Sequence, residues 1–247
     1  MSASWYLPEW SLPAGVHALQ TTRLDGASAA PYASFNLGDH VGDSPEAVAA
    51  NRTKLARAWQ MEPCWLKQVH GIEVVDATAT GTPCADAVIS RTPGKACVVM
   101  TADCLPVLFA SAQGDVVAAA HAGWRGLHAG VLEATLKAMR TPAEQVSVWL
   151  GPAIGPQAFE VGGEVRDAFM QVDRAAASAF IPSQRDGHFY ADLYLLACQR
   201  LAACGVSQVA GGGECTFSDE ARFFSYRRQA ITGRQASLIW LSEHGAA

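Results

Sequence analysis

Apolar residues along the chain recur in blocks whose spacing predicts a mixture of helices and strands. Residues 42–59, GDSPEAVAANRTKLARAW, carry a helix-start signal, because Asp43 or Ser44 can cap the first turn and Pro45 suits the first helical position. Apolar residues then recur at roughly helical spacing up to Trp59. Two further helices are expected at residues 162–170 and 191–204.

Short apolar runs between turn residues predict strands or strand ends. They lie at residues 64–71, 72–77, 86–90, 95–101, 147–150, 206–210, 222–228 and 237–241. Residues 115–139, DVVAAAHAGWRGLHAGVLEATLKAM, read as strand, turn and helix, because small apolar residues precede two glycines and a helical stripe follows. Intermixed strands and helices predict an α+β (mixed α/β) fold. The chain shows no repeat, low-complexity tract or linker, so a single domain over residues 1–247 is expected.

Composition limits the function classes. Half of the 247 residues are hydrophobic, which is ample for a core, and only 17% are charged, which argues against extensive disorder. The net charge is −5 and no block of Lys or Arg occurs, so nucleic acid is a poor partner. We see neither a signal peptide nor an apolar run that could span a bilayer, and expect a cytoplasmic protein without a membrane partner. The seven cysteines are expected to be mostly buried thiols.

One apolar stretch is broken by polar residues. In VVMTADCLPVLFA, residues 98–110, the apolar runs enclose Thr101, Asp103 and Cys104. Neighbouring residues of a strand point to opposite faces, so a bulge or loop is required here if Asp103 and Cys104 are to serve one site.

His70, Cys104 and His121 share a context, since each follows strand-like apolar residues and precedes Gly or Pro within a few positions. Two imidazoles and a thiolate would suit a first-row metal and would leave a coordination position open, as in catalytic zinc sites. The same residues could instead form a metal-free Cys–His nucleophile pair oriented by Asp103. Their spacing matches no short metal motif, so a core thiol and two hydrogen-bonded histidines remain an alternative.

Several cationic residues near these positions could bind an anion such as phosphate. Arg125, Lys67 and Arg52 are the candidates for binding phosphate or substrate, and Arg125 is favoured by its glycine-flanked turn before a predicted helix. Adjacent Arg227 and Arg228 are expected to be surface charges, because neighbours in a strand cannot both face inward. The GGGECT segment, residues 211–216, lacks the Lys and Ser/Thr of a phosphate loop. Apart from His70 and His121, His40 in NLGDHVGD is the one histidine of interest.

Several stretches resemble the bacterial laccase-domain proteins, once described as multicopper polyphenol oxidases and now as zinc-dependent purine nucleoside phosphorylases linked to peptidoglycan editing. They occur in order from about residue 20 to 241 and include YASFNLGDHVGDSPEAVAANR, KQVHG, TADCLPVLF, AAAHAGWRGL, GPAIGPQAFEVG, CTF, FFSYRR and TGRQASLIWL. The combination of ADC, HAGWRG and QVHG is highly specific.

The resemblance implies a layered α/β/β/α sandwich with mixed sheets, and His70, Cys104 and His121 as zinc ligands. It implies phosphorolysis of adenosine, inosine and S-methyl-5′-thioadenosine, with adenosine deamination as a side activity. Purine nucleosides and phosphate are then the partners; the oligomeric state stays open. Cys104 and His121 are expected to be catalytic as well as metal-binding, with Asp103 as proton shuttle, neighbour of the ligands or turn cap. Gln68, Asn36 and Tyr226 are further candidates for contacts with sugar or base.

Alternative functions use the same residues. One is a metal-free Cys–His amidase acting on peptidoglycan precursors, and another is non-enzymatic binding of a nucleotide or such a precursor. A copper-binding polyphenol oxidase is disfavoured, because seven histidines cannot supply a blue-copper site and a three-copper cluster. A lone His₂Cys site could still take Cu²⁺ in vitro, so copper binding would be weak evidence for oxidase activity.

Overall fold

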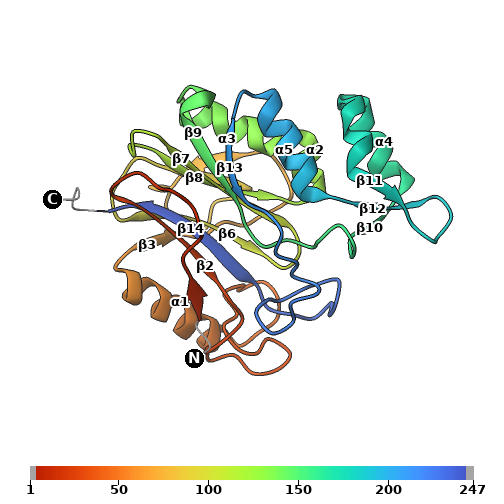
Figure 1. Ribbon diagram of the computed structural model, residues 1–247. Helices are drawn as coiled ribbons and strands as arrows, with labels where there is room; N and C mark the ends of the chain where they lie inside the picture. Colours follow the sequence, from red (N-terminus) through yellow and green to blue (C-terminus); the bar gives the residue numbers. More distant parts are fainter. Residues whose placement is uncertain (1–3, 243–247) are drawn as a thin grey trace.

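Two mixed β-sheets stack face to face in the computed structural model, which describes residues 4–242 (Figure 1). The first sheet has the strand order β1-β2-β14-β6-β3, and only its β3–β6 pair is parallel. Its strands are β1 (Trp5–Tyr6), β2 (Val16–Thr21), β3 (Glu62–Cys64), β6 (Lys95–Thr101) and β14 (Gln235–Leu241).

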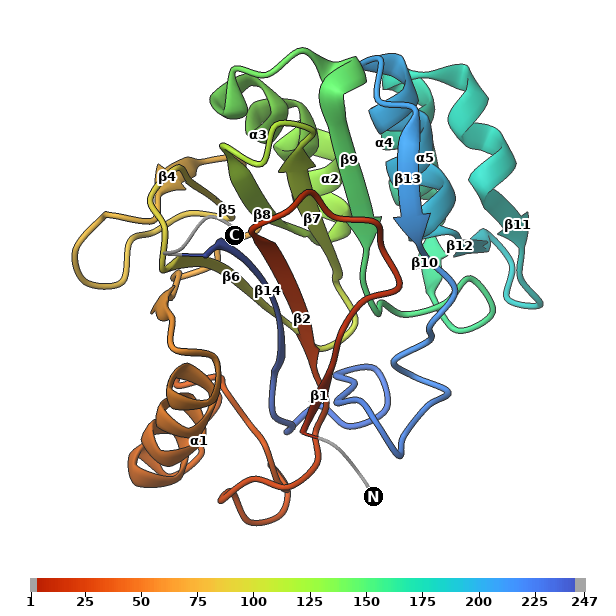
Figure 2. The same cartoon turned by 60° about the vertical axis from the view of Figure 1, so that its left-hand side comes forward.

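The second sheet has six strands in the order β13-β9-β7-β8-β5-β4, and its two outermost pairs are parallel (Figure 2). Its strands are β4 (Val74–Asp76), β5 (Ala87–Ser90), β7 (Leu105–Ser111), β8 (Val117–Ala122), β9 (Val146–Leu150) and β13 (Gln208–Gly211). A smaller antiparallel sheet, β10-β12-β11, lies beside helix α4 at the right of Figure 1. It comprises β10 (Glu160–Gly162), β11 (Phe180–Pro182) and β12 (His188–Ala191).

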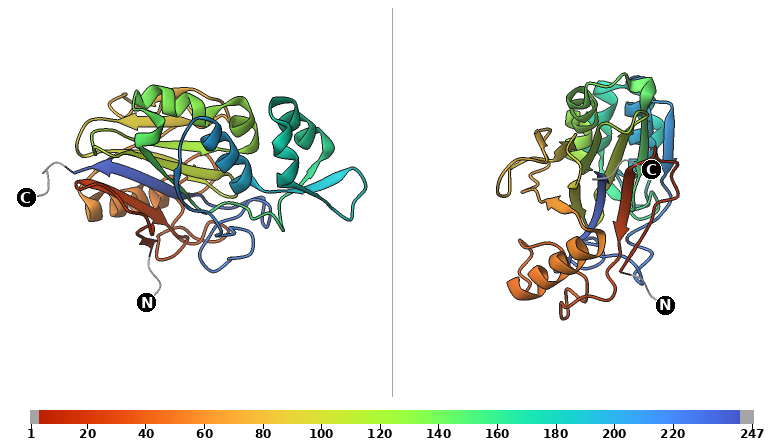
Figure 3. Two further views of the ribbon diagram at one scale, coloured as in Figure 1. Left: turned by 45° about the horizontal axis from the view of Figure 1, so that its top comes forward. Right: turned by 90° about the vertical axis from the view of Figure 1, so that its left-hand side faces the viewer.

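Helices cover the outer faces of the stacked sheets (Figure 3). Helix α1 packs on the five-stranded sheet, and α2, α3 and α5 pack on the six-stranded sheet. The helices are α1 (Pro45–Trp59), α2 (Trp124–Ala129), α3 (Val131–Met139), α4 (Gly163–Val172) and α5 (Leu193–Ala203), with 3₁₀ turns at Ala143–Gln145 and Arg174–Ala179. The α/β/β/α layering expected from the sequence is therefore confirmed.

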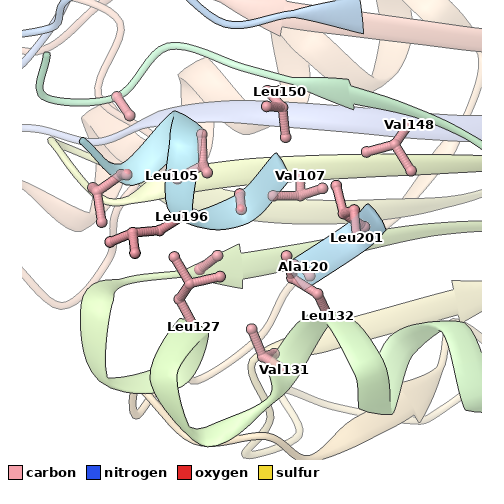
Figure 4. Close-up of a cluster of buried hydrophobic side chains, with 14 of the residues drawn as sticks. Leu105, Val107, Ala120, Leu127, Val131, Leu132, Val148, Leu150, Leu196 and Leu201 are labelled. Carbon is pink, nitrogen blue, oxygen red and sulfur yellow. The ribbon is translucent and has the colours of Figure 1, made fainter. Parts of the chain in front are cut away.

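Alternation along the central strands explains the three apolar layers. In β7, Val107 faces the helices of the six-stranded sheet, where it meets Leu132 and Leu201 (Figure 4). The next residue, Leu108, points to the opposite face and packs between the sheets with Ile239. A third layer packs the far face of the five-stranded sheet against α1. Strands buried on both faces read as continuous apolar runs, which is the pattern of residues 98–110.

The capping signal for α1 is confirmed, because the helix begins at Pro45 and the Ser44 Oγ accepts a hydrogen bond from the Ala47 N–H. The helix expected within residues 115–139 is divided into α2 and α3 at Gly130, whose φ of +105° only glycine adopts readily. In the part of the chain that the structure describes, no helix combines the length and apolarity that crossing a membrane would need.

Two predicted strands are wrong. Residues 65–71 make only an isolated bridge between Lys67 and Cys84, and residues 222–228 consist of turns and irregular backbone. In both regions, side chains form hydrogen bonds with backbone groups that would otherwise pair with a neighbouring strand. The Asp86 carboxylate accepts the N–H groups of residues 69–71, and the Arg228 guanidinium donates to the carbonyls of residues 216, 217 and 223.

Candidate metal centre

The side chains of His70, Cys104 and His121 converge at one end of the stacked sheets. Their ligand atoms all lie within 4.8 Å of one another, and His70 Nε2 is 3.7 Å from Cys104 Sγ. Each comes from a different segment: His70 from the irregular segment 65–71, Cys104 from the link between β6 and β7, and His121 from β8. The sequence therefore identified three residues that the fold brings together.

The polar break in residues 98–110 is a crossing between the two sheets. Strand β6 ends at Thr101 in the five-stranded sheet, and β7 begins at Leu105 in the six-stranded sheet. The bend expected at this point is present, and Asp103 has a φ of +101°. Because Pro106 pairs with His121 across the β7–β8 ladder, Cys104 is held close to His121.

Asp86, a residue that the sequence analysis missed, orients two of the three candidate ligands. It is fully buried and accepts the N–H groups of Val69, His70 and Gly71 at 3.1, 2.9 and 2.6 Å. Its Oδ1 is also 2.8 Å from His121 Nδ1, so Nε2 is the ring nitrogen left for a metal. A carboxylate at the head of the buried strand AVIS was the signal available in the sequence.

Hydrogen bonds keep the Asp86 carboxylate ionised. Burial alone would raise the pKa of Asp86, but the hydrogen bonds from His121 and from the N–H groups of Gly71 and Val69 hold it below its ordinary value. These contacts also hold His70 at a φ of +61°, a conformation uncommon for a residue with a side chain.

Gly123 leaves the space that two of the candidate ligands, His70 and Cys104, occupy. A Cβ atom at this position would lie 2.7 Å from His70 Cδ2 and 3.0 Å from Cys104 Sγ. Gly126, one turn into α2, is similarly close to the segment that carries His70, since its Cβ would lie 3.0 Å from the Gly71 carbonyl oxygen. The two glycines of HAGWRG therefore allow close packing of α2 against the site.

The thiol and the imidazoles perturb each other. Burial would raise the pKa of Cys104, but the positive charge and hydrogen bonds of His121 and His70 lower it to about 6. Burial would lower the pKa of His121, but Cys104 and Asp86 raise it to about 9. Without a metal, the site therefore favours a thiolate beside an imidazolium at neutral pH.

A cavity of about 330 Å³ opens beside His70, Cys104 and His121. Its wall combines apolar and polar side chains, including Gln68, Met100, Thr101, Ile154, Phe159 and Tyr226. His40, Arg227 and Arg234 line it as well, so the cavity carries two guanidinium groups. Its volume lies in the range of small-molecule sites.

Of the residues expected to contact substrate, Gln68 and Tyr226 line the cavity. Tyr226 is 56% exposed, whereas the Gln68 amide bonds the backbone N–H and carbonyl of Met100, both at 2.8 Å. Asn36 is fully buried outside the cavity wall, and its Oδ1 accepts the N–H groups of Gly38 and Arg234.

The three cations favoured as phosphate ligands lie elsewhere. Arg125 is exposed and stacks on the Trp124 ring. Arg52 donates to the Leu37 carbonyl, pairs with Asp39 and lies over the Trp65 ring. Lys67 is exposed in a neighbouring hollow that it shares with Asp39 and His40. None of the three is among the residues that line the cavity in the described chain.

The cations that do line it are Arg227, expected at the surface, and Arg234, which was not singled out. Residues 226–228 form a turn rather than a strand, and Arg227 is exposed as expected, although it also lines the cavity. Its guanidinium donates to the carbonyls of Ala158 and Glu160.

Asp103 connects the site to two neighbouring segments. One carboxylate oxygen accepts from the Thr216 hydroxyl and the other from the Arg227 N–H, each at 2.7 Å. Its backbone carbonyl accepts the Ile154 N–H. Three segments that contribute to or flank the cavity are thus fastened to the crossing that carries Cys104.

Comparisons with known proteins agree with this architecture. The family model described as "Multi-copper polyphenol oxidoreductase laccase" matches residues 17–242. The purine nucleoside phosphorylase PA4543 of Pseudomonas aeruginosa is 57% identical over 240 residues, which cover 97% of this chain and 99% of that protein. The purine nucleoside phosphorylase YfiH of Escherichia coli is 54% identical over 239 residues, covering 95% and 98%.

Solved structures share the fold over almost the whole chain. The crystal structure of Neisseria meningitidis protein NMB0706 superposes with a TM-score of 0.95 at 49% identity, covering 97% of this chain and 100% of that one. The hypothetical protein YfiH of Bacillus licheniformis gives a TM-score of 0.86 at 27% identity, covering 92% and 93%.

Proposed function

Because the chain belongs to the multi-copper polyphenol oxidoreductase laccase family, as its motifs predict, we propose that it is a metal-dependent purine nucleoside phosphorylase. Two relatives that match it over nearly their whole length bear that name. The observation that carries the proposal is the His70, Cys104 and His121 cluster beside a cavity of nucleoside size. We propose a cytoplasmic enzyme with small-molecule substrates and no nucleic-acid or membrane partner.

The donor set fits zinc. Two imidazoles and a thiolate converge, Asp86 fixes the tautomer of His121, and Gly123 leaves room beside the sulfur. His70, Cys104 and His121 would hold the ion, which would supply Lewis acidity toward a bound nucleoside. Copper could occupy the same donors in vitro.

The substrates we propose are adenosine, inosine and S-methyl-5′-thioadenosine. Phosphorolysis breaks the glycosidic bond of the nucleoside and joins phosphate to C1 of the sugar, giving free base and ribose 1-phosphate or its methylthio analogue. Adenosine deamination is the proposed side activity. The Phe159 and Tyr226 rings offer apolar surface to a purine, and Asp103 positions the segments around residues 216 and 227.

The test combines product analysis with metal analysis. Protein purified without added metal is expected to carry about one zinc per chain and to convert inosine and phosphate to hypoxanthine and ribose 1-phosphate. His70→Ala should lose both metal and activity, whereas His188→Ala, at a histidine on β12 outside the cavity, should retain both. Absence of product from zinc-loaded wild-type protein would contradict the proposal.

A second candidate function is a metal-free amidase acting on peptidoglycan precursors. One observation favours it: Cys104, with its pKa lowered to about 6, adjoins His121, which Asp86 orients, as in a nucleophile–base–acid arrangement. This enzyme would keep full activity after chelation, and a substrate-like electrophile would alkylate Cys104. The phosphorylase would instead lose activity on chelation and regain it with zinc.

An oxidase with a full copper set is not supported by the site. Within residues 4–242, the one cluster of at least three metal-binding side chains is that of His70, Cys104 and His121. A laccase needs further histidines for its three-copper cluster, and the whole chain has only seven.

A further inference from the structure

Arg234 is a cationic residue on the wall of the cavity that holds the three metal-binding side chains. Its Nη1 donates to the carbonyls of Thr232 and Gly233 at 3.0 Å. No carboxylate of the described residues lies within ion-pair distance of it. Burial also lowers the pKa of Arg234, despite the nearby Cys104 and Asp103. A guanidinium partly withdrawn from water and without an anionic partner calls for an anion from outside.

Neighbouring residues hold this arginine in place by packing and hydrogen bonding. A Cβ atom on Gly38 would lie 2.8 Å from Arg234 Cγ, so the aliphatic stem occupies space that only glycine leaves. The buried Asn36 accepts the N–H groups of both Arg234 and Gly38, at 2.8 and 2.9 Å. The position of Arg234 is therefore fixed by the NLGDH segment, residues 36–40, and His40 of that segment lines the same cavity.

Thr101 supplies a second, independent signal. It is 2% exposed, and its Oγ1 has no hydrogen-bond partner among the described residues. Thr101 lines the same cavity as Arg234, and it pairs with Gln235, the residue after Arg234, across the β6–β14 ladder. A buried hydroxyl without a partner is costly, and a ligand oxygen would satisfy it.

The competing carboxylate in the cavity is already engaged. Both oxygens of Asp103 accept hydrogen bonds, one from Thr216 and one from the Arg227 N–H. Both terminal nitrogens of the Arg227 guanidinium donate to the carbonyls of Ala158 or Glu160, whereas the side-chain hydrogen bonds of Arg234 within the described residues come from Nη1 alone. Arg234 is thus the cation whose surroundings in the cavity best match an incoming anion.

We propose that Arg234 and Thr101 form the subsite for the phosphate co-substrate, replacing Arg125, Lys67 and Arg52 in that role. The inference rests on the proposed phosphorolysis. A guanidinium and a hydroxyl both donate to phosphate oxygens. One phosphate oxygen bonds to C1 of the sugar while the C1–N bond breaks. The electron pair of the C1–N bond leaves with the purine, which takes up a proton from solvent.

The test measures phosphate in two ways, by calorimetric titration in phosphate-free buffer and by the KM for phosphate at saturating inosine. Arg234→Gln is expected to raise the dissociation constant and the KM for phosphate about 10- to 100-fold, as for the loss of a charge-assisted hydrogen bond. The KM for inosine should change less than about twofold. Arg234→Lys should restore part of the loss, and Arg174→Gln, at an exposed arginine, is the control.

Two further variants keep the proposal falsifiable if Arg234→Gln folds poorly. Gly38→Ala displaces the arginine without removing its charge, and Thr101→Val removes the hydroxyl at nearly constant volume. Both should raise the KM for phosphate severalfold. Unchanged phosphate binding in folded Arg234→Gln would overturn the subsite. The subsite would also be overturned if removing the metal with a chelator abolished phosphate binding by the wild type while Arg234→Gln still bound phosphate.

The outcomes separate the subsite from the reaction. Phosphate binding that depends on Arg234, without turnover of any nucleoside, would contradict the phosphorylase proposal and still support an anion site. Phosphorolysis with an unaltered KM for phosphate in Arg234→Gln would support the phosphorylase proposal and overturn the subsite. A wild-type protein that binds no phosphate in either assay overturns the subsite.

Discussion

Replacing Asp86 by Asn tests how strongly a buried carboxylate controls the metal centre. The carboxylate accepts hydrogen bonds from the N–H groups of residues 69–71 and from His121. An amide of the same shape offers one acceptor oxygen, and its NH₂ group faces donors. Losing such a partner typically weakens metal binding about 10- to 100-fold, or about 1.4–2.7 kcal/mol. The free energy of unfolding of the metal-free protein should also fall, by about 3 kcal/mol.

Zinc affinity is measured by competition with a chromophoric chelator, and Co²⁺ substitution reports the coordination geometry by its visible spectrum. Asp76→Asn, on the neighbouring strand β4, is the matched control, because among residues 4–242 this exposed carboxylate accepts hydrogen bonds only from the backbone N–H and hydroxyl of Thr78. If Asp86→Asn folds and binds zinc within about twofold of wild type, the carboxylate does not orient the ligands and the reasoning is refuted.

Three other changes probe the site and the core. Gly123→Ala should abolish zinc binding in a folded protein, since the added methyl would lie 2.7 Å from His70 Cδ2; tight binding by equilibrium dialysis would contradict this. In chelated protein, alkylation of Cys104 by iodoacetamide, followed by peptide mass spectrometry, should rise with pH through a midpoint near 6, because the thiolate forms above its pKa; a midpoint near 9 would refute the lowered pKa. The fully buried Cys97, whose pKa burial raises, should stay unmodified over the same range. Leu108 is fully buried between the sheets, so Leu108→Ala should lower the free energy of unfolding by about 2–5 kcal/mol in urea titration. A loss below about 1 kcal/mol would show that this layer relaxes to fill the space left by the removed side chain.

Local signals in the sequence located the elements whose ends are set by neighbouring residues. The start of α1 follows from Ser44 and Pro45, which act within one helical turn. The central strands follow from apolar runs because both of their faces are buried. The segments at 65–71 and 222–228 could not be predicted in this way, because side chains take the place of a strand partner. Asp86, distant in sequence, bonds the first segment, and Arg228, within the second, bonds nearby loop carbonyls.

Cys104 and His121 could be identified because strand ends beside glycine or proline are recognisable in the sequence and the family motifs coincide with them. His70 was identified through the family motif, since the strand expected to end there does not form. Their supporting residues were harder to find. Arg125 and Arg234 are both arginines next to glycine, and only the tertiary fold turns the first outward onto Trp124 and the second into the cavity. Asp86 reads as an ordinary residue before a strand until the fold places His121 2.8 Å away.

With a metal bound as proposed, the crossing at residues 102–104 would couple the supply of that metal to the tolerance of core mutations. Cys104 sits between strands of different sheets, so its distance from His70 and His121 depends on the packing of the layer between those sheets. A metal that binds only the folded chain stabilises it by about 4 kcal/mol when its free concentration is a thousandfold above the dissociation constant. That gain is comparable to the loss expected from a large-to-small substitution such as Leu108→Ala. Variants of this layer should therefore persist when the metal is abundant and be lost when it is scarce, so that nutrient supply selects which core sequences survive.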